Sequence, residues 1–434
     1  MDTSGPTQVT RVLFLCWGYS IHAWRRIRIF TEDPCFDVAV ASTYPYQFDK
    51  AVNILLPSGE TSLGPNTAEG RQEVPGTFMG KNNGLKSRLH GMLSHENAPG
   101  FLRAPYHVYR LIRELITAFK DLKHLKAAVK SYNPDVVFLQ TLIYPCYLSY
   151  FLPKSIPIMI TFWNGDVTWW AKWSGIERLL KKYIVTYGAK RARALTVNSQ
   201  TAYDACLGYG VSENALHIIR YPGVDLRRFF PMDKDQARRD LSISAKKVIL
   251  WPRGFGGFLN SDVMIEAFAK ILPHHADTLL LITSDVGGAD EYKKHLEQAL
   301  RLGIDGHIRW DGRVGWEKMP LYYNAADVMV SLSSNDSLPN CMLESMACGL
   351  PVIMGDIPQI REWVGGEFRV PPRSADILAE RITDLLAKSP EEIRIIGEKH
   401  LSMMKNHFGN EQNIEQIKQL VHRVALKGHA SAPH

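Results

Sequence analysis

Two carboxylates, Asp336 and Glu344, stand eight residues apart around a Leu-Pro-Asn turn. A loop that only connects two elements has no need of acids at this spacing. Carboxylates can accept hydrogen bonds from hydroxyl groups, and they can stabilise a positive charge that develops during a reaction. The stretch is therefore a candidate functional site, and the elements around it should position both acids.

The local pattern predicts a strand, a loop, a helix and a second strand. Residues 328–334 are apolar and β-branched, which is typical of a buried strand. Residues 341–349 predict a short helix that ends at Gly349, and a further strand begins at Leu350. This arrangement places Asp336 at the loop tip and Glu344 about two turns into the helix.

The same alternation of strands and helices extends along both halves of the chain. We expect strands at residues 11–17, 36–42, 135–140, 156–162 and 194–199, and again at 247–252, 278–283, 307–312, 328–333 and 351–354. Continuous apolar strands separated by helices are typical of parallel sheets covered on both faces. The prediction is an α/β protein with two doubly wound, Rossmann-like domains facing across a cleft, with ligands at the carboxyl ends of the strands.

We expect an N-terminal domain over residues 1–222 and a C-terminal domain over residues 223–407. A closing amphipathic helix, at about 408–426, should pack back on the first domain. The stretch between Tyr44 and Pro105 is rich in Gly, Pro and Asn, and we interpret it as a functional or mobile loop region.

Composition limits the protein class. The 434 residues are 45% hydrophobic and 22% charged, as in soluble globular proteins, and no apolar run is long enough to span a membrane. The six cysteines are scattered without a CxxC pair, which favours buried thiols over disulfides or zinc. Residues 1–225 hold 25 Lys and Arg against 17 Asp and Glu, so an anionic partner is expected there, either a membrane surface or a substrate.

The segment DSLPNCMLESMACGLPVI resembles the two-carboxylate signature of retaining GT-B glycosyltransferases of family 4, also called glycosyl transferases group 1. NPDVVFLQ, RYPGVDLRRFFP and YYNAADVMVSLSS follow in the family's order, and the resemblance covers nearly the whole chain. It implies transfer of a sugar from a nucleotide-sugar donor, with retained configuration and without a metal or other cofactor. It also implies a glycan, lipid-linked or other glycoconjugate acceptor, as in polysaccharide biosynthesis, in the cytoplasm or on the inner face of the cell membrane.

The resemblance assigns roles to individual donor-side residues. Asp336 would hold the sugar or stabilise oxocarbenium charge, Glu344 would bind the ribose, and Arg253 would bind the diphosphate. Gly18 would let the backbone approach a substrate. The start of the helix would present backbone N–H groups and a positive dipole end to the donor. The donor-binding candidates there are Pro339, Asn340, Cys341 and Met342.

A second set of candidates lies in the segment TFWNGDV and after it. The resemblance makes Asp166 a second catalytic candidate. Aromatic and amide side chains suit a sugar acceptor, which makes acceptor-side candidates of Trp163, Asn164 and Trp169.

Three departures from the family pattern leave alternatives open. Asp336 is shorter than the usual Glu, no lysine follows Arg253, and Trp163 stands where many members have His. The alternatives are a GT-B nucleotide-sugar epimerase and a non-catalytic sugar-binding relative. Individual residues also have structural readings: Asp336 as a helix cap, Arg253 in an ion pair and the tryptophans as core. For residues 106–130, an amphipathic segment, we weigh docking on the first sheet against binding a membrane surface.

Overall fold

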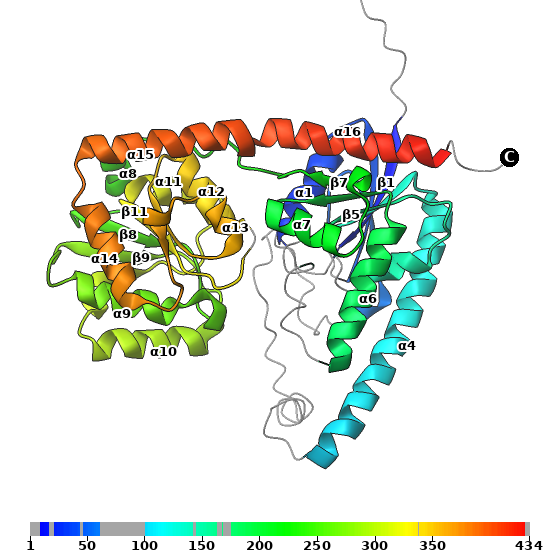
Figure 1. Cartoon of the computed structure of the whole chain (residues 1–434), viewed down its shortest axis with the longest axis horizontal. Helices are drawn as coiled ribbons and strands as arrows, with labels where there is room; N and C mark the ends of the chain where they lie inside the picture. Colours follow the sequence, from blue (N-terminus) through cyan, green and yellow to red (C-terminus); the bar gives the residue numbers. More distant parts are fainter. Residues whose placement is uncertain are drawn as a thin grey trace, which may run out of the picture. The chain divides into compact units, whose positions relative to one another are not determined.

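The computed structural model describes residues 9–16, 21–43, 47–60, 100–141, 145–162, 167, 175–336 and 338–429. The chain divides into two compact units. Unit 1 comprises residues 1–197, 205–217 and 417–434, and unit 2 comprises residues 198–204 and 218–416. Each unit is built on its own parallel sheet (Figure 1).

Unit 1 holds a seven-stranded sheet in the order β3-β2-β1-β4-β5-β6-β7. Its central strands are almost wholly apolar and buried, which is why they lie inside a sheet covered on both faces. In the parallel register, Val12 lies opposite Val38 and Val136. The strands are β1 (Thr10–Cys16), β2 (Phe36–Ser42), β3 (Val52–Leu55), β4 (Val136–Leu139), β5 (Ile158–Thr161), β6 (Ala194–Val197) and β7 (Leu216–Ile218).

The helices of the first half connect these strands. They are α1 (Ile21–Thr31), α2 (Pro57–Glu60), α4 (Gly100–Tyr132), η1 (Cys146–Phe151), α6 (Gly175–Arg191), α7 (Gln200–Gly208) and η3 (Glu213–Ala215). The last helix of the chain, α16 (Asn410–His429), also contributes to unit 1 from Ile417 onward. Lys418 Nζ donates to Asp33 Oδ2 at 2.6 Å, and Thr10 Oγ1 lies 2.7 Å from His422 Nδ1.

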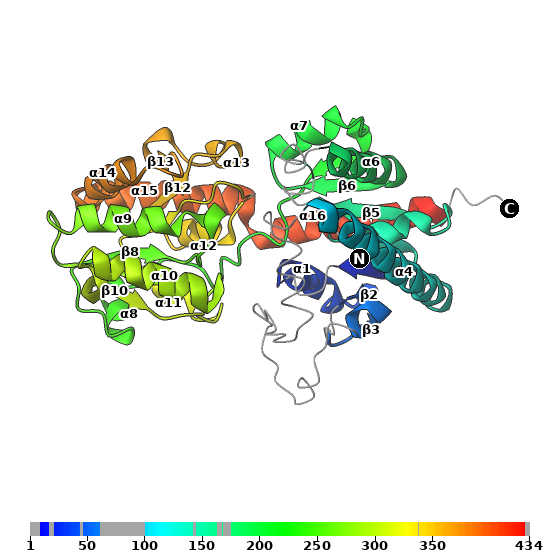
Figure 2. The ribbon, with the colours of Figure 1, turned by 90° about the horizontal axis from the view of Figure 1, so that it is seen from below.

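Unit 2 holds a six-stranded parallel sheet in the order β10-β9-β8-β11-β12-β13. Figure 1 shows three layers, with α8, α11 and α12 above the sheet and α9, α10 and α14 below it. Figure 2 shows the lower helices side by side in the order α10, α9, α14. The strands are β8 (Lys247–Trp251), β9 (Thr278–Ile282), β10 (Ile308–Trp310), β11 (Val328–Ser331), β12 (Val352–Gly355) and β13 (Arg369–Val370).

The α-helices of unit 2 are α8 (Lys234–Asp240), α9 (Ser261–Ile271), α10 (Gly288–Arg301), α11 (Met319–Ala325), α12 (Asn340–Ala347), α13 (Pro358–Arg361), α14 (Ala375–Leu386) and α15 (Pro390–Met403). Shorter helical turns are η4 (Gly257–Leu259), η5 (Asp305–His307), η6 (Gly366–Phe368) and η7 (Met404–Phe408). α12 ends at Ala347 with Cys348 as its C-cap, and the next residue, Gly349, has a φ of +73° that favours glycine. α15 approaches so closely that a Cβ on Gly397 would lie 2.5 Å from the Gly349 carbonyl oxygen.

Every strand expected from the sequence is present, and no end differs from the expected one by more than three residues. β3, β7 and β13 were not predicted. β3 lies in the stretch between Tyr44 and Pro105 that we interpreted as a loop region. It is an edge strand with exposed Val52 and Asn53, so it lacks the apolar run that marks a buried strand.

The position of Glu344 also differs from the prediction. α12 begins at Asn340, directly after the extended residue Pro339, so Glu344 is the fifth helical residue. It therefore lies little more than one turn into the helix, rather than two. Within the part of the chain that the structure describes, no helix is long and apolar enough to cross a membrane.

Candidate active site

Arg253 and Asp336 form an ion pair in unit 2. Arg253 lies two residues beyond β8, and Asp336 lies in the loop beyond β11. Because β8 and β11 are neighbouring parallel strands, their carboxyl ends meet at the same edge of the sheet. Arg253 Nη2 lies 2.9 Å from Asp336 Oδ2 and donates to Ser333 Oγ at 3.2 Å. Two predicted site residues, 83 positions apart, thus contact each other directly.

The environment keeps Arg253 protonated. Burial alone would lower the pKa of its guanidinium, but the attraction of Asp336 and a contact with Cys341 raise that pKa above its ordinary value. Burial raises the pKa of the Cys341 thiol to about 11, and Arg253 offsets part of that effect. Cys341 is therefore a protonated, inert thiol at neutral pH.

The two loops that carry Arg253 and Asp336 are joined by Asn260. Its side-chain amide donates to the carbonyl of Leu332 and to Ser334 Oγ, each at 2.7 Å. A backbone bond from Ser334 N–H to the carbonyl of Phe258 adds a second link of 2.8 Å. Asn260 is buried and left-handed, with φ of +56°. Sequence reasoning missed it, although Asn is the residue other than Gly best suited to that conformation.

Glu344 is buried, with 8% of its surface exposed, and each of its carboxylate oxygens accepts a hydrogen bond. Trp316 Nε1 donates to Oε1 at 3.0 Å, and the Tyr323 hydroxyl donates to Oε2 at 2.9 Å. Burial and the nearby carboxylate raise the pKa of Tyr323 well above its usual range, so its hydroxyl stays a donor. Neither aromatic residue was predicted. The signal that could have found them was the buried acid itself, because a buried carboxylate requires hydrogen-bond donors.

Trp316 is held in turn by Arg228 and Phe229. The guanidinium carbon of Arg228 lies 4.3 Å from the centre of the indole, a cation–π contact. The ring of Phe229 lies 5.6 Å from the same indole. Both neighbours fix the direction in which Trp316 donates to Glu344.

The start of α12 bears on the four candidates at positions 339–342. Pro339 is the N-cap and has an extended backbone. Met342 N–H donates to the carbonyl of Pro339 at 3.0 Å, which weakens its assignment to donor binding. Cys341 Sγ lies 3.9 Å from Arg253 Nη1, so the start of this helix is next to the ion pair.

Five predicted residues lie outside the part of the chain that the structure describes: Gly18, Trp163, Asn164, Asp166 and Trp169. Their roles stay predictions. Among the described residues, no group of three or more His, Cys, Asp or Glu could hold a metal ion. Asp233, in the DKD sequence before α8, caps that helix by accepting from Gln236 N–H at 2.7 Å.

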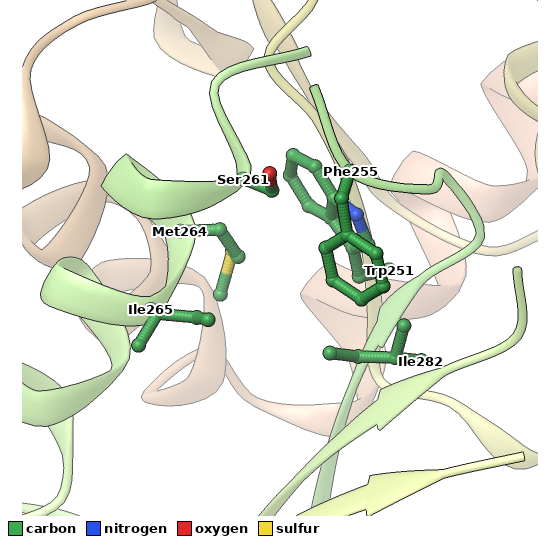
Figure 3. Close-up of a pocket in the computed structure, with 6 residues that line it drawn as sticks. All are labelled: Trp251, Phe255, Ser261, Met264, Ile265 and Ile282. Atoms are coloured by element: carbon green, nitrogen blue, oxygen red, sulfur yellow. The ribbon is translucent and has the colours of Figure 1, made fainter. Parts of the chain in front are cut away.

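A small hollow in the core of unit 2 is lined by Trp251, Phe255, Ser261, Met264, Ile265 and Ile282 (Figure 3). It has no space for a water molecule. Its one polar side chain, Ser261, lies 2.8 Å from His295 Nε2 through its hydroxyl. The hollow is therefore a packing gap and not a ligand site.

Comparison with known proteins supports this architecture. A sucrose-phosphate synthase from Thermosynechococcus elongatus has a TM-score of 0.69 and 18% identity, covering 96% of this chain and 99% of that one. HepE of Anabaena, solved with UDP and glucose, has a TM-score of 0.68 and 15% identity, covering 95% and 100%. The fold is that of the GT-B glycosyltransferases.

The sequence comparisons identify the family. Residues 248–388 match Glycosyl transferases group 1, and residues 87–228 match Glycosyltransferase Family 4. The chain belongs to glycosyltransferase family 4. A D-inositol 3-phosphate glycosyltransferase of Geodermatophilus obscurus is 37% identical over 147 residues, which cover 32% of this chain and 33% of the relative. The chain spans a third to a half of the length of the first curated relatives it matches.

Proposed function

We propose that the chain is a retaining glycosyltransferase that uses a nucleotide-sugar donor and needs no metal. One observation carries the proposal. A guanidinium and two carboxylates lie on segments that follow neighbouring strands of one sheet. Arg253 lies in the loop after β8, Asp336 in the loop after β11, and Glu344 in α12. A diphosphate requires a cation, and a ribose requires a group that accepts hydrogen bonds from its hydroxyls. A reacting sugar that develops positive charge requires a negative charge beside it.

On the donor side, Arg253 would bind the diphosphate through charge-assisted hydrogen bonds. An ionised carboxylate has about four lone-pair sites. Glu344 would accept hydrogen bonds from ribose hydroxyls at the carboxylate that Trp316 and Tyr323 hold. Because these two donors hold the carboxylate in place, little ordering would be needed when the ribose binds.

At the reacting sugar, Asp336 would stabilise the positive charge that develops as the nucleotide leaves. Its ion pair with Arg253 bears on this step, since the two groups bind each other at 2.9 Å before any donor arrives. An incoming diphosphate would compete with Asp336 for the guanidinium. Donor binding would then release the Asp336 carboxylate from its ion pair. Its negative charge would be available to the sugar, where catalysis needs it.

The acceptor that we propose is a glycan, a lipid-linked sugar or another glycoconjugate, as in polysaccharide biosynthesis. The positive excess of residues 1–225 suits an anionic acceptor or an anionic membrane surface. The Geodermatophilus relative is named for D-inositol 3-phosphate, an anionic molecule, which fits a positively charged binding region. The setting that we propose is the cytoplasm or the inner face of the cell membrane.

A panel of UDP-, GDP- and ADP-sugars tests the proposal in two stages. Binding should raise the melting temperature, because a ligand that binds only the folded state stabilises it. Sugars that bind are then incubated with candidate acceptors, with and without EDTA, and released nucleotide and product anomer are measured. Arg253→Ala should abolish the thermal shift, whereas Arg301→Ala, an exposed arginine at the end of α10, should keep it.

The outcomes separate the alternatives. A glycoside with the donor's configuration, formed in EDTA, supports the proposal. An altered nucleotide-sugar without a glycoside identifies an epimerase instead. Binding without any turnover identifies a sugar-binding relative, and an inverted product contradicts the retaining mechanism.

A further inference from the structure

Unit 1 exposes large apolar side chains on neighbouring elements. Phe119 on α4 is 78% exposed, and on α6 Leu179 and Tyr183 are 67% and 66% exposed. Phe151 of η1 is also exposed, and η1 contacts both helices. Figures 1 and 2 both show α4 and α6 running beside each other. We call the exposed faces of α4 and α6, together with Phe151, the α4–α6 surface.

The exposed charged side chains that the structure describes on this surface are cationic. α4 exposes four lysines after Phe119, and α6 exposes Lys182 and Lys190. In residues 116–132 and 179–193, where the structure describes most side chains, the single acid is Asp121. That acid is fully buried and accepts from Ser58 N–H at 2.9 Å, so it does not offset the positive surface.

The α4–α6 surface is not the side on which these helices dock. On α4, Leu125 and Val129 are buried, whereas Phe119 and the four lysines are exposed. On α6, Val185 and Ala189 are buried, whereas Leu179 and Tyr183 are exposed. Each helix therefore has one apolar face for the unit 1 core and further apolar side chains left outside it.

We propose that the α4–α6 surface binds the anionic headgroups of a lipid membrane. Lysine is attracted to an anionic leaflet, and its effect is greatest close to the surface. Tyrosine, phenylalanine and leucine gain by inserting at the headgroup boundary, and tyrosine keeps its hydroxyl in the polar layer. The inference deepens the proposed function. It rests on that function in one respect, namely that a lipid-linked acceptor would lie at a membrane surface.

The charge argues against a second copy of this chain as the occupant. In a twofold contact the same surface would meet itself, so each lysine cluster would face another. Like charges brought together in an interface are costly. An anionic lipid layer is complementary in charge and also accepts the apolar side chains.

Co-sedimentation with vesicles tests the proposal on the full chain. Vesicles of phosphatidylcholine alone are compared with an equal mixture of phosphatidylcholine and phosphatidylglycerol, at low and high salt. Wild type should bind the mixed vesicles and bind phosphatidylcholine much more weakly. Lys182→Gln with Lys190→Gln should lower binding at low salt by about tenfold or more, at roughly fivefold per lysine.

A second variant isolates the apolar contribution. Leu179→Ser with Tyr183→Ser should lower binding at both salt concentrations, because insertion of apolar groups is not screened. The matched control is Lys293→Gln with Lys294→Gln on α10, which removes the same charge from exposed positions in unit 2 and should bind like wild type. Melting temperatures and the donor-induced thermal shift should match wild type in all three variants.

Equal binding of wild type to the two kinds of vesicle overturns the proposal. The proposal is also overturned if both α6 variants bind the vesicles as strongly as wild type does. Light scattering that shows a dimer lost in Leu179→Ser with Tyr183→Ser, without vesicle binding, assigns the surface to self-association instead. Because the donor-induced shift is measured separately, failure of the proposed function is distinguished from failure at this surface.

Discussion

At the scale of single residues, Arg253 and Asp336 constrain each other. The guanidinium is held by Asp336 and Ser333, and the carboxylate has a cation beside it before any substrate binds. A mutation of either residue therefore alters two groups at once. Removing Arg253 breaks the ion pair on the Asp336 side, whereas neutralising Asp336 leaves Arg253 available to a diphosphate.

Asp336→Asn should lower kcat by about ten- to a thousandfold, because it removes the negative charge that faces the reacting sugar. The donor KM should stay level or fall, since Arg253 loses a competitor for its hydrogen bonds. Steady-state kinetics with varied donor measure both constants. Asp336→Glu restores the family's usual acid and serves as the control that keeps activity. Wild-type turnover by Asp336→Asn would mean that the acid has only a structural role.

Glu344→Gln should act mainly on the donor KM, with a rise of about tenfold and a smaller change in kcat. The amide can turn its oxygen toward Trp316 Nε1 and its nitrogen toward the Tyr323 hydroxyl, which is able to accept. The buried site therefore stays bonded, and the lost charge is what ribose binding detects. A kcat loss as large as that of Asp336→Asn, at unchanged KM, would contradict the ribose assignment.

At the scale of elements, the site depends on two loops staying in register at the sheet edge. Asn260, at the start of α9, bonds to the β11 loop, and that loop carries Asp336. The ends of β8 and β11 are thus coupled by side-chain bonds as well as by the sheet. Gly397 adds a further constraint, because its lack of a side chain lets α15 pack on the end of α12.

Replacing Asn260 separates its two contributions. Asn260→Ala should lower the free energy of unfolding by roughly 2–4 kcal/mol, since buried Leu332 O loses a donor and alanine is strained at φ of +56°. Glycine tolerates that φ, so Asn260→Gly should lower the free energy of unfolding by roughly 1 kcal/mol less than Asn260→Ala does. Urea unfolding measures both values. Equal stability of the Ala and Gly variants would show that backbone strain contributes nothing at this position.

At the scale of the whole molecule, buried His400 couples stability to pH. Burial lowers the pKa of His400 from 6.5 to about 4, and its ring nitrogen Nδ1 lies 3.3 Å from the carbonyl oxygen of Leu350. The unfolded chain binds a proton at this residue below pH 6.5, whereas the folded protein does so only near pH 4. Its stabilising contribution is therefore present above pH 6.5 and is lost as the pH falls to about 4.

The loss from this one group should approach about 3 kcal/mol at the lower end of that range. His400→Gln keeps a side-chain N–H donor but does not titrate, so its unfolding free energy should vary less between pH 6.5 and 4. Urea unfolding at several pH values compares the two slopes. Ion pairs lower the carboxyl pKa values of Asp33 and Asp356, and these two groups affect stability below this pH range. Parallel slopes for variant and wild type would show that another group controls acid stability.

Local patterns in the sequence were enough to predict the two-sheet architecture. Runs such as residues 38–41 and 248–251 are apolar throughout, and a strand buried on both faces requires that pattern wherever it lies in the sheet. Short edge strands such as β3 and β13 were missed because exposed or two-residue strands do not need it. Asp336 and Glu344 were recognisable by type and by their spacing around a turn, whereas Arg253 was assigned through the resemblance to the family.

The partners of those residues were decided only by the tertiary structure. Asp336 meets Arg253 from 83 positions away because β8 and β11 are neighbours in a sheet whose strand order is not written in any local segment. Glu344 meets Trp316 and Tyr323 because α11 packs beside α12. The sequence determined which residues could do chemistry, since side-chain type and local periodicity are properties of the chain itself. The fold determined which of them touch, since contact depends on how distant segments pack.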